Sequence, residues 1–224
     1  MADETSLRQS LETVQQRIGA AARFAGRSPD DITLIAVSKT HSAERILPAL
    51  QCGQRHFGEN RVQEAQAKWP PLRAQYPDVC LHLIGQLQSN KAADAVALFD
   101  VIHSVDRPSL AQALARAIRE APKPPMLLVQ VNTGEEEQKG GVMPTDLFDF
   151  IALCRETLGL PVAGLMCIPP EADDPAPHFA FLRQKARDFG LGLLSMGMSS
   201  DFETAIKLGA THVRVGSAIF GERQ

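Results

Sequence analysis

Ile32-Thr33-Leu34-Ile35-Ala36-Val37 is a short β-rich segment whose apolar side chains occupy both alternating faces. This pattern is typical of a strand that is covered on both sides, as in a parallel sheet. A helix is expected next, over residues 43–50, and Gly53 ends it. Strand and helix together form one βα unit.

The alternation of strand and helix continues to the end of the chain. Further strands are expected at residues 55–58, 81–85, 101–104, 126–131, 162–167, 193–196 and 212–215. Amphipathic segments lie between them, including residues 109–118, 146–158, 178–189 and 201–208. Eight βα units imply a parallel sheet and favour its closure into a barrel. An open doubly wound sheet is the alternative, but no G-x-G-x-x-G motif follows the first strand.

The N-terminal segment has the pattern of a helix rather than a strand. Leu7, Leu11, Val14 and Ile18 recur at helical spacing. We therefore expect an α/β fold, a single (β/α)8 TIM barrel domain over residues 1–224, with an extra N-terminal helix within residues 1–28 that packs on it.

Composition and charge exclude several classes of protein. The formal net charge is -3 and no long basic run occurs, so nucleic acid is not an expected partner. The apolar segments are too short to cross a membrane, and the acidic N-terminus does not resemble a signal peptide. The four cysteines form no C-x-x-C pair, so neither a zinc site nor a disulfide framework is expected. We expect a cytoplasmic protein with reduced thiols and no metal site.

Lys39 follows the first strand and shares the parity of Ile35 and Val37. In a barrel this parity directs the side chain into the mouth at the carboxyl ends of the strands, where barrel active sites form. An amine among apolar neighbours has a lowered pKa and can attack a carbonyl. A lysine that merely extends to water is the alternative, and Lys39 alone does not exclude it.

The turns after the last two expected strands are rich in glycine and serine. Ser199 and Ser200 precede one short helix, and Gly216 and Ser217 precede another. Barrels often bind phosphate with the loops after strands seven and eight, where helix N-termini present free N–H groups. The run Ser200-Asp201-Phe202-Glu203 is also a capping box, which would explain Ser200 without a ligand.

Arg214 has the parity of a side chain inside the barrel, and closure would place it beside Lys39. An inward arginine commonly pairs with a carboxylate. Here it could instead donate to the ring nitrogen of a phosphorylated pyridine aldehyde, because amine, phosphate turns and ring-nitrogen donor together describe a site for pyridoxal 5′-phosphate (PLP). Asn60 could reach the same mouth or cap a helix. His82 and His103 lack metal-site spacing, so core or surface histidines explain them as well.

Two loops at the same end of the expected barrel remain open to two interpretations. Residues 135–141 follow the fifth strand and residues 169–177 follow the sixth. They could be mobile lids over the mouth or plain solvated connections. Lys139 in the first loop could offer a second amine or lie on the surface.

Several motifs occur together in a way that is specific to one family. They are Val37-Ser38-Lys39-Thr40, Phe57-Gly58-Glu59-Asn60, His82-Leu83-Ile84-Gly85, Leu87-Gln88-Ser89-Asn90-Lys91, Leu194-Ser195-Met196-Gly197-Met198-Ser199 and Arg214-Val215-Gly216-Ser217-Ala218-Ile219-Phe220-Gly221. Through them essentially the whole chain resembles the pyridoxal phosphate homeostasis proteins, which are similar to the N-terminal barrel of alanine racemase. Arg61 and Gln86 depart from the family pattern, where tyrosine and proline are usual.

The resemblance implies a role for each candidate residue. PLP would be held as a Schiff base on Lys39, with Arg214 facing the pyridine nitrogen. The phosphate would be bound by Ser199, Ser200, Gly216 and Ser217, and Asn60 and Met166 would lie near the ring. The protein would buffer or deliver PLP, with PLP-dependent apo-enzymes as candidate recipients and without a reaction of its own.

The alternative is an enzyme, above all a PLP-dependent amino-acid racemase. Arginine stays protonated, so Arg214 would hardly protonate the pyridine, which disfavours transamination-type chemistry. A racemase tolerates this but needs a second acid–base group, and the only tyrosine, Tyr76, is expected at the opposite end of the barrel. A Schiff-base aldolase of the usual barrel type would carry its lysine on strand six, where residues 162–167 contain none.

Overall fold

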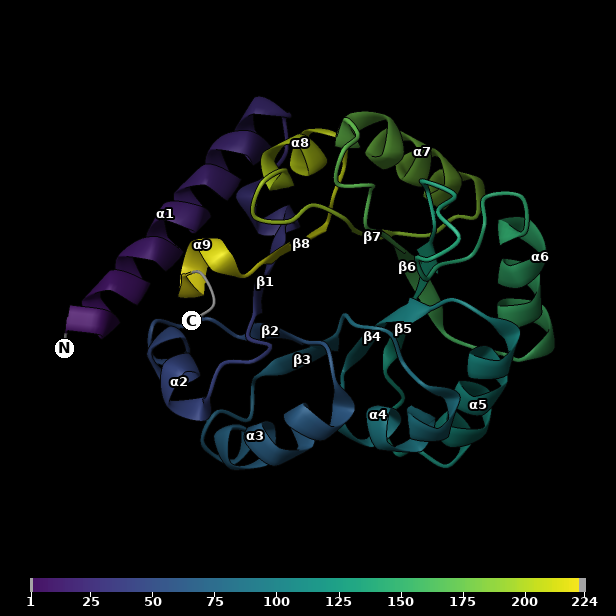
Figure 1. The fold of residues 1–224 in the computed structure, drawn as a ribbon, viewed down its shortest axis with the longest axis horizontal. Helices are drawn as coiled ribbons and strands as arrows, with labels where there is room; N and C mark the ends of the chain where they lie inside the picture. Colours follow the sequence, from purple (N-terminus) through teal and green to yellow (C-terminus); the bar gives the residue numbers. More distant parts are fainter. Residues whose placement is uncertain (1, 222–224) are drawn as a thin grey trace.

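The computed structural model describes residues 2–221, with side chains from residue 6 onward, so residues 1 and 222–224 of the expected domain lie outside the described residues. Within that range, eight parallel strands form a closed barrel in sequence order (Figure 1). The strands are β1 (Thr33–Val37), β2 (His56–Glu59), β3 (Cys80–Leu83), β4 (Val101–Val105), β5 (Met126–Val131), β6 (Val162–Cys167), β7 (Leu193–Ser195) and β8 (His212–Val215).

Helices surround the strands on the outside of the barrel (Figure 1). They are α1 (Ala2–Phe24), α2 (Ala43–Gln51), α3 (Val62–Gln75), α4 (Ala92–Leu98), α5 (Pro108–Arg119), α6 (Leu147–Ala152), α7 (Pro175–Asp188), α8 (Phe202–Lys207) and α9 (Ser217–Phe220). Short turns of other helix types are η1 (Pro29–Asp31), η2 (Ser89–Lys91) and a π-helical η3 (Leu153–Thr157). The expected (β/α)8 barrel is confirmed, and each expected strand lies within two residues of its observed position.

Closure of the barrel depends on the pairing of its first and last strands. β1 pairs with β8 in parallel, with Ile35 opposite Arg214. This pairing leaves no open edge, which excludes the doubly wound alternative. It also brings the end of β1, which carries Lys39, beside the end of β8.

The N-terminal helix α1 packs on the barrel through its apolar face. Leu7, Leu11, Val14 and Ile18 of α1 are all buried. The helix lies along α8 and α9, on the side of the barrel where β1 and β8 meet (Figure 1).

The apolar core lies mainly between the strands and their surrounding helices. Inside the barrel a much smaller apolar cluster contains Val101, Leu128 and Met166. Buried polar side chains share the strands around it, including His82, His103, Ser195, His212 and Arg214. The barrel interior is therefore partly a polar layer, although most barrels fill this space with branched apolar residues.

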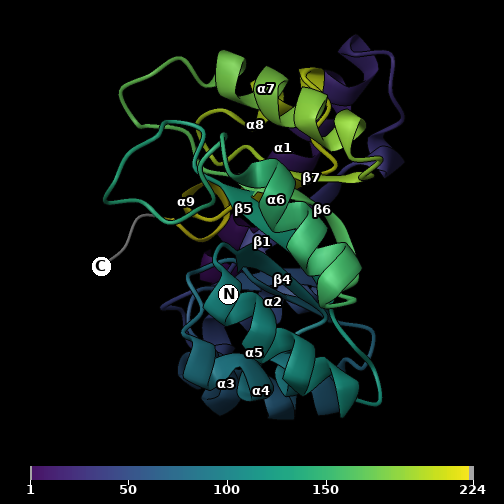
Figure 2. The same cartoon turned by 90° about the vertical axis from the view of Figure 1, so that its right-hand side faces the viewer.

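The long loops after β5 and β6 extend from the same side of the barrel (Figure 2). The two loops contact each other: Lys139 Nζ lies 3.5 Å from the carbonyl oxygen of Pro169. Among the described residues, no helix is long and apolar enough to span a membrane.

Candidate functional site

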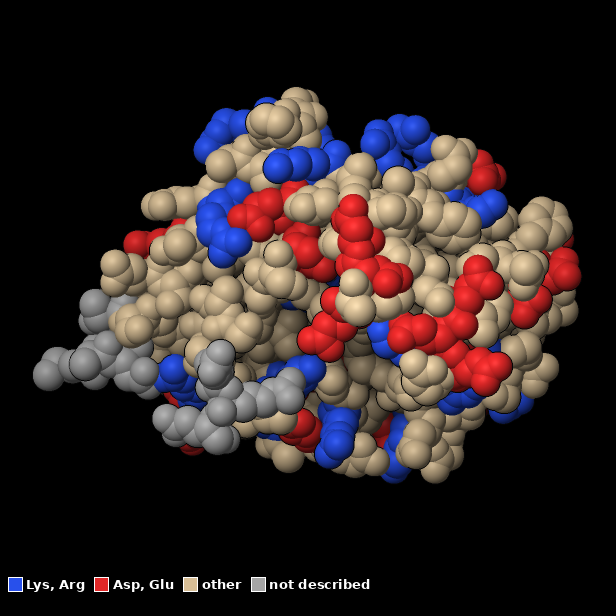
Figure 3. Space-filling model, turned by 45° about the horizontal axis from the view of Figure 1, so that its top comes forward, with Lys and Arg blue, Asp and Glu red and all other residues tan. Residues whose placement is uncertain are grey.

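A cavity of about 700 Å³ opens at the carboxyl ends of the strands. Seven of the eight residues expected at the site line it: Lys39, Asn60, Ser199, Ser200, Arg214, Gly216 and Ser217. Figure 3 shows a hollow near the middle of the molecular surface, bordered by both acidic and basic side chains.

Met166 is the expected site residue that does not line the cavity. Its side chain is fully buried and packs with Val101 and Leu128 inside the barrel. The proposed place of Met166 beside a bound ring therefore stays a prediction.

Lys39 is held by an unusual backbone conformation at the end of β1. The next residue, Thr40, has φ 67°, a region that β-branched residues rarely adopt. The Glu64 carboxylate accepts a hydrogen bond from the Thr40 backbone N–H, and Thr40 Oγ1 donates to the Lys39 carbonyl at 2.6 Å. Such strain persists only where the surroundings enforce it, and it occurs often at functional sites.

A buried ion pair between α3 and β2 stabilises the backbone on both sides of Lys39. Lys68 Nζ lies 2.8 Å from Glu59 Oε1, and both side chains are almost fully buried. Lys68 also donates to the carbonyl oxygens of Ser38 and His41, on either side of Lys39. Glu59 Oε1 accepts a further hydrogen bond from Ser38 Oγ at 2.6 Å. These contacts determine the path of the chain that carries Lys39.

The turns after β7 and β8 meet at one side of the cavity. The Gly216 N–H donates to Ser199 Oγ at 3.4 Å, which joins the two turns. Gly197 has φ 92°, and a β-carbon there would lie 2.6 Å from the Ala205 β-carbon. Glycine at this position allows the first turn to pack directly on α8, with its serines toward the cavity.

The capping box that would explain Ser200 without a ligand does not form. α8 begins at Phe202 with Asp201 as its N-cap, so Ser200 lies outside the helix. Asp201 Oδ1 instead accepts a hydrogen bond from the Met198 N–H at 2.6 Å, and Glu203 pairs with Arg17 of α1. The Asp201 side chain therefore stabilises the tight turn before the helix, and Ser200 lies at the cavity wall.

Arg214 lies at the floor of the cavity and is 4% exposed. It donates to Ser195 Oγ at 2.6 Å and to the Cys167 carbonyl oxygen at 2.9 Å. Both partners are neutral, and within the described part of the chain no ion pair involves Arg214. Burial lowers the pKa of its guanidinium, because a charged group loses solvation there. A buried cation without a carboxylate partner is suited to a polar ligand in the cavity.

A chain of hydrogen bonds leads from Arg214 through the barrel to its opposite end. His103 Nδ1 lies 2.9 Å from Ser195 Oγ, which also receives the Arg214 hydrogen bond. His103 Nε2 lies 2.9 Å from His82 Nδ1, and His82 Nε2 lies 3.0 Å from His56 Nδ1. Burial lowers the pKa of His82 and His103 well below the usual range, so both rings are neutral.

Sequence reasoning missed several residues of the cavity wall. They are Val37, His41, Ile84, Gly85, Gln86, Gln130, Gln138, Gly140, Ile168, Met198 and Gly221. Strand parity could have indicated Gln130, a polar residue near the end of β5 that donates to the Gly140 carbonyl. Lys139 lines the rim and pairs with Glu136 at 2.6 Å. The loop after β5 is therefore part of the cavity wall.

Tyr76 lies far from the cavity in the fold. It caps the C-terminus of α3, on the side where the chain enters β3, and Arg55 covers its ring. The expected position of this side chain, away from the mouth, is confirmed.

Comparison with known proteins gives a consistent result. Residues 9–224 match the family model for the N-terminal domain of alanine racemase. The chain is 41% identical to the pyridoxal phosphate homeostasis protein of Vibrio cholerae, and the match covers 97% of both chains.

Solved structures extend the comparison to the fold. The structure of PipY from Synechococcus elongatus with PLP bound has a TM-score of 0.83 and 39% identity, and the match covers 96% of this chain and all of that one. Alanine racemase of Clostridium difficile has a TM-score of 0.74 at 16% identity over 57% of its length, which shows a shared barrel fold only.

Proposed function

The chain belongs to the family of pyridoxal phosphate homeostasis proteins, whose fold is that of the alanine racemase N-terminal domain, and we propose that it binds PLP in the cavity at the carboxyl ends of its strands. Bound there, the cofactor is stored and supplied in cellular PLP homeostasis. The relatives with this name cover nearly the whole chain, whereas the racemases share only its fold.

One observation carries the proposal. A single cavity is lined by an amine from the turn after β1, a buried guanidinium from β8 and the serine-rich turns after β7 and β8. These groups match the aldehyde, the ring nitrogen and the phosphate of PLP. We propose that Lys39 forms a Schiff base, in which its amine and the aldehyde condense to an imine and one water is released.

The remaining candidate residues have binding roles in this proposal. Ser199, Ser200, Ser217 and the Gly216 backbone would hold the phosphate, because hydroxyl and N–H donors in a tight turn suit an anion. Asn60, at the end of β2, would contact the ring from the side of the cavity.

Arg214 disfavours transamination-type catalysis, which a racemase would not need. A bound PLP acts as an electron sink when its pyridine nitrogen is protonated. Arg214 can donate a hydrogen bond to that nitrogen but remains protonated itself. We infer that the site holds PLP without activating it strongly, and that no second acid–base group is supplied by Tyr76, which lies at the other end of the barrel.

We further propose that PLP-dependent apo-enzymes receive the cofactor. A Schiff base is reversible, so PLP can leave by hydrolysis or by exchange with another amine. The free cysteines Cys52, Cys80, Cys154 and Cys167 suit a reducing compartment, and we therefore place this exchange in the cytoplasm.

Borohydride reduction of the PLP-loaded protein, followed by mass spectrometry, tests the proposal. Reduction should fix the cofactor to Lys39, and Lys39→Arg should abolish the labelling and the imine absorbance. Lys139→Arg is the matched control, because this amine also lines the cavity. Labelling of Lys139 instead of Lys39 would contradict the assignment, and amino-acid racemisation with multiple turnovers would contradict the carrier function.

A further inference from the structure

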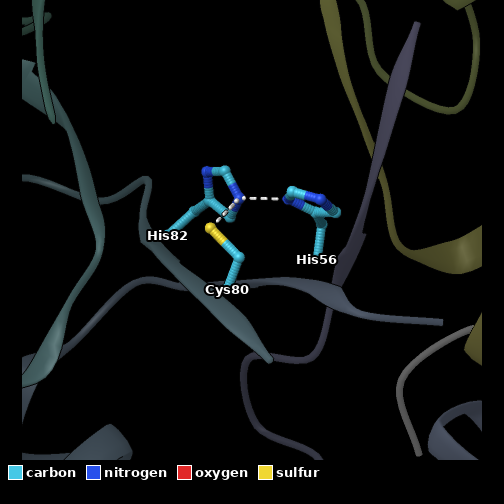
Figure 4. Close-up of side chains that lie close together, drawn as sticks. All are labelled: His56, Cys80 and His82. Carbon is cyan, nitrogen blue, oxygen red and sulfur yellow. Dashed lines mark hydrogen bonds between the residues drawn. The ribbon is translucent and has the colours of Figure 1, made fainter. Parts of the chain in front are cut away.

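Three potential metal ligands converge at the barrel end opposite the cavity (Figure 4). His56 is the first residue of β2 and Cys80 the first residue of β3, and the two face each other in the strand register. His82 lies two residues after Cys80, so both side chains point to the same side of β3. The ligand atoms of all three lie within 4.8 Å of one another.

The spacing of these atoms fits a tetrahedral metal. His56 Nδ1 lies 3.0 Å from His82 Nε2, and Cys80 Sγ lies 3.4 Å from the same nitrogen. Typical zinc bonds in a tetrahedron place two nitrogens about 3.4 Å apart and nitrogen and sulfur about 3.6 Å apart. The two observed distances differ from these values by only a few tenths of an ångström, and the third, between His56 and Cys80, is at most 4.8 Å.

Hydrogen bonding alone does not satisfy this group. His82 Nε2 is approached by both His56 Nδ1 and Cys80 Sγ. A ring nitrogen carries either one proton or one lone pair in the ring plane, so it forms one good hydrogen bond. A cation between the three side chains would give each of them a bond.

The protonation states of the two histidines suit a metal, whereas Cys80 must lose its proton on binding. Burial lowers the pKa of His56 and of His82, which keeps both imidazoles neutral and able to coordinate. Burial raises the pKa of the Cys80 thiol to about 11, so a bound cation would have to displace its proton. The displaced proton would leave to solvent, because Cys80 is only half-buried.

The surroundings provide support for the ligands. His82 Nδ1 lies 2.9 Å from His103 Nε2, and a ligating histidine usually donates its second N–H to such a partner. The Asp100 carboxylate lies near enough to act on both His56 and Cys80 by its charge. It is bonded to Arg73, Lys123 and a backbone N–H, so it would influence the site from outside rather than ligate.

We propose that His56, Cys80 and His82 form a binding site for a zinc-class divalent cation, with a fourth position open to solvent. His56 and Cys80 are half-buried, so the cation can enter from the barrel end without opening the fold. The site lies outside the PLP cavity, and the proposal does not depend on PLP binding. Three protein ligands with an open fourth position are typical of catalytic zinc sites, whereas structural zinc sites are closed.

Titration of the metal-free protein with Zn²⁺ against a chromophoric chelator tests the proposal. We expect one Zn²⁺ per chain, in PLP-free and PLP-loaded protein alike. Cys80→Ser and His56→Ala should each weaken binding by at least the roughly 10–100-fold that loss of an outer ligand partner costs. Cys52→Ser removes another half-buried free thiol and should leave binding unchanged.

Co²⁺ provides a second readout at the same site. Bound Co²⁺ should give a thiolate charge-transfer band that is lost in Cys80→Ser and kept in Cys52→Ser. Circular dichroism would confirm that the variants remain folded. Absence of stoichiometric Zn²⁺ binding, or binding that both site variants retain, would overturn the proposal.

Discussion

Gly85 determines where Asn60 lies at the cavity wall. A β-carbon on Gly85 would lie 2.7 Å from the Asn60 α-carbon and closer still to its carbonyl oxygen. We expect Gly85→Ala to push the end of β2 aside, with a loss of roughly 1–3 kcal/mol of stability from overpacking and a weaker affinity for PLP.

Gly192→Ala is the matched control, because no atom lies within 4 Å of a β-carbon there and its φ is ordinary. Urea unfolding and PLP titration by absorbance measure both effects. Equal stability and equal PLP affinity of the two variants would show that the position of Asn60 does not depend on this contact.

Individual residues differ in how well their roles follow from the sequence. Strand parity and barrel closure place Lys39 and Arg214 at one mouth, and both line the cavity. The local motif at Ser200 was a poorer guide, because a capping box competes with a tight turn that uses Asp201. His56 and Cys80 are 24 residues apart in the chain and meet only through strand pairing, so their spacing gives no metal motif.

The contact between α3 and β2 supports the Lys39 segment through one buried ion pair. We expect Lys68→Met to cost about 3–5 kcal/mol, because it leaves the Glu59 charge buried without its partner. PLP affinity should also fall, since Lys68 holds the carbonyl oxygens on both sides of Lys39.

The double variant Glu59→Gln/Lys68→Met should recover much of that stability, because a neutral amide can still accept from Trp69 and Ser38. Lys185→Met breaks an exposed pair with Asp188 and should change stability by less than about 1 kcal/mol. Urea midpoints of the wild-type protein and the three variants measure these differences in stability. A double variant no more stable than Lys68→Met would argue against an uncompensated charge as the cause.

Element boundaries show where sequence patterns reach their limit. The helix expected over residues 178–189 begins at Pro175, because Asp174 caps it and proline suits a first helical position. The helix expected over residues 146–158 is α-helical only to Ala152 and continues as a π-helical turn. Hydrophobic periodicity identifies such helices well but contains little information about their ends.

The polar interior makes the stability of the whole barrel sensitive to acid. Burial lowers the pKa of His212 to about 4 and that of His103 well below its usual range. For a histidine with a lowered folded pKa, the stabilisation is complete above the unfolded pKa of about 6.5 and is lost as the pH falls toward the folded value. We expect the titration of His212 alone to lower the free energy of unfolding by on the order of 2 kcal/mol at pH 5.

Urea midpoints at pH 7.5 and pH 5, in the presence of a chelator, measure this loss. His212→Asn should reduce the change in stability between these two pH values. An amide can replace the hydrogen bond between His212 Nδ1 and Thr211 Oγ1 but cannot titrate. A stability that does not change between these pH values would contradict the prediction.

The histidine chain connects the two proposed sites at opposite ends of the barrel. Ser195 accepts from Arg214, and we infer that without metal it donates to His103 Nδ1, so that each histidine in the chain donates from Nε2 toward His56. A cation on His82 Nε2 removes that proton and reverses the direction, so that His103 Nδ1–H donates to Ser195 Oγ. The serine oxygen then accepts from two donors and holds Arg214 less strongly.

We therefore expect Zn²⁺ to strengthen PLP binding by a few-fold, because Arg214 becomes a better donor to the cavity. By thermodynamic reciprocity PLP must raise the Zn²⁺ affinity by the same factor. PLP titrations with and without Zn²⁺, and Zn²⁺ titrations with and without PLP, measure the two factors independently. Ser195→Ala interrupts the chain and should abolish the coupling while both ligands still bind; an equal effect of Zn²⁺ in this variant would show that the coupling does not pass through Ser195.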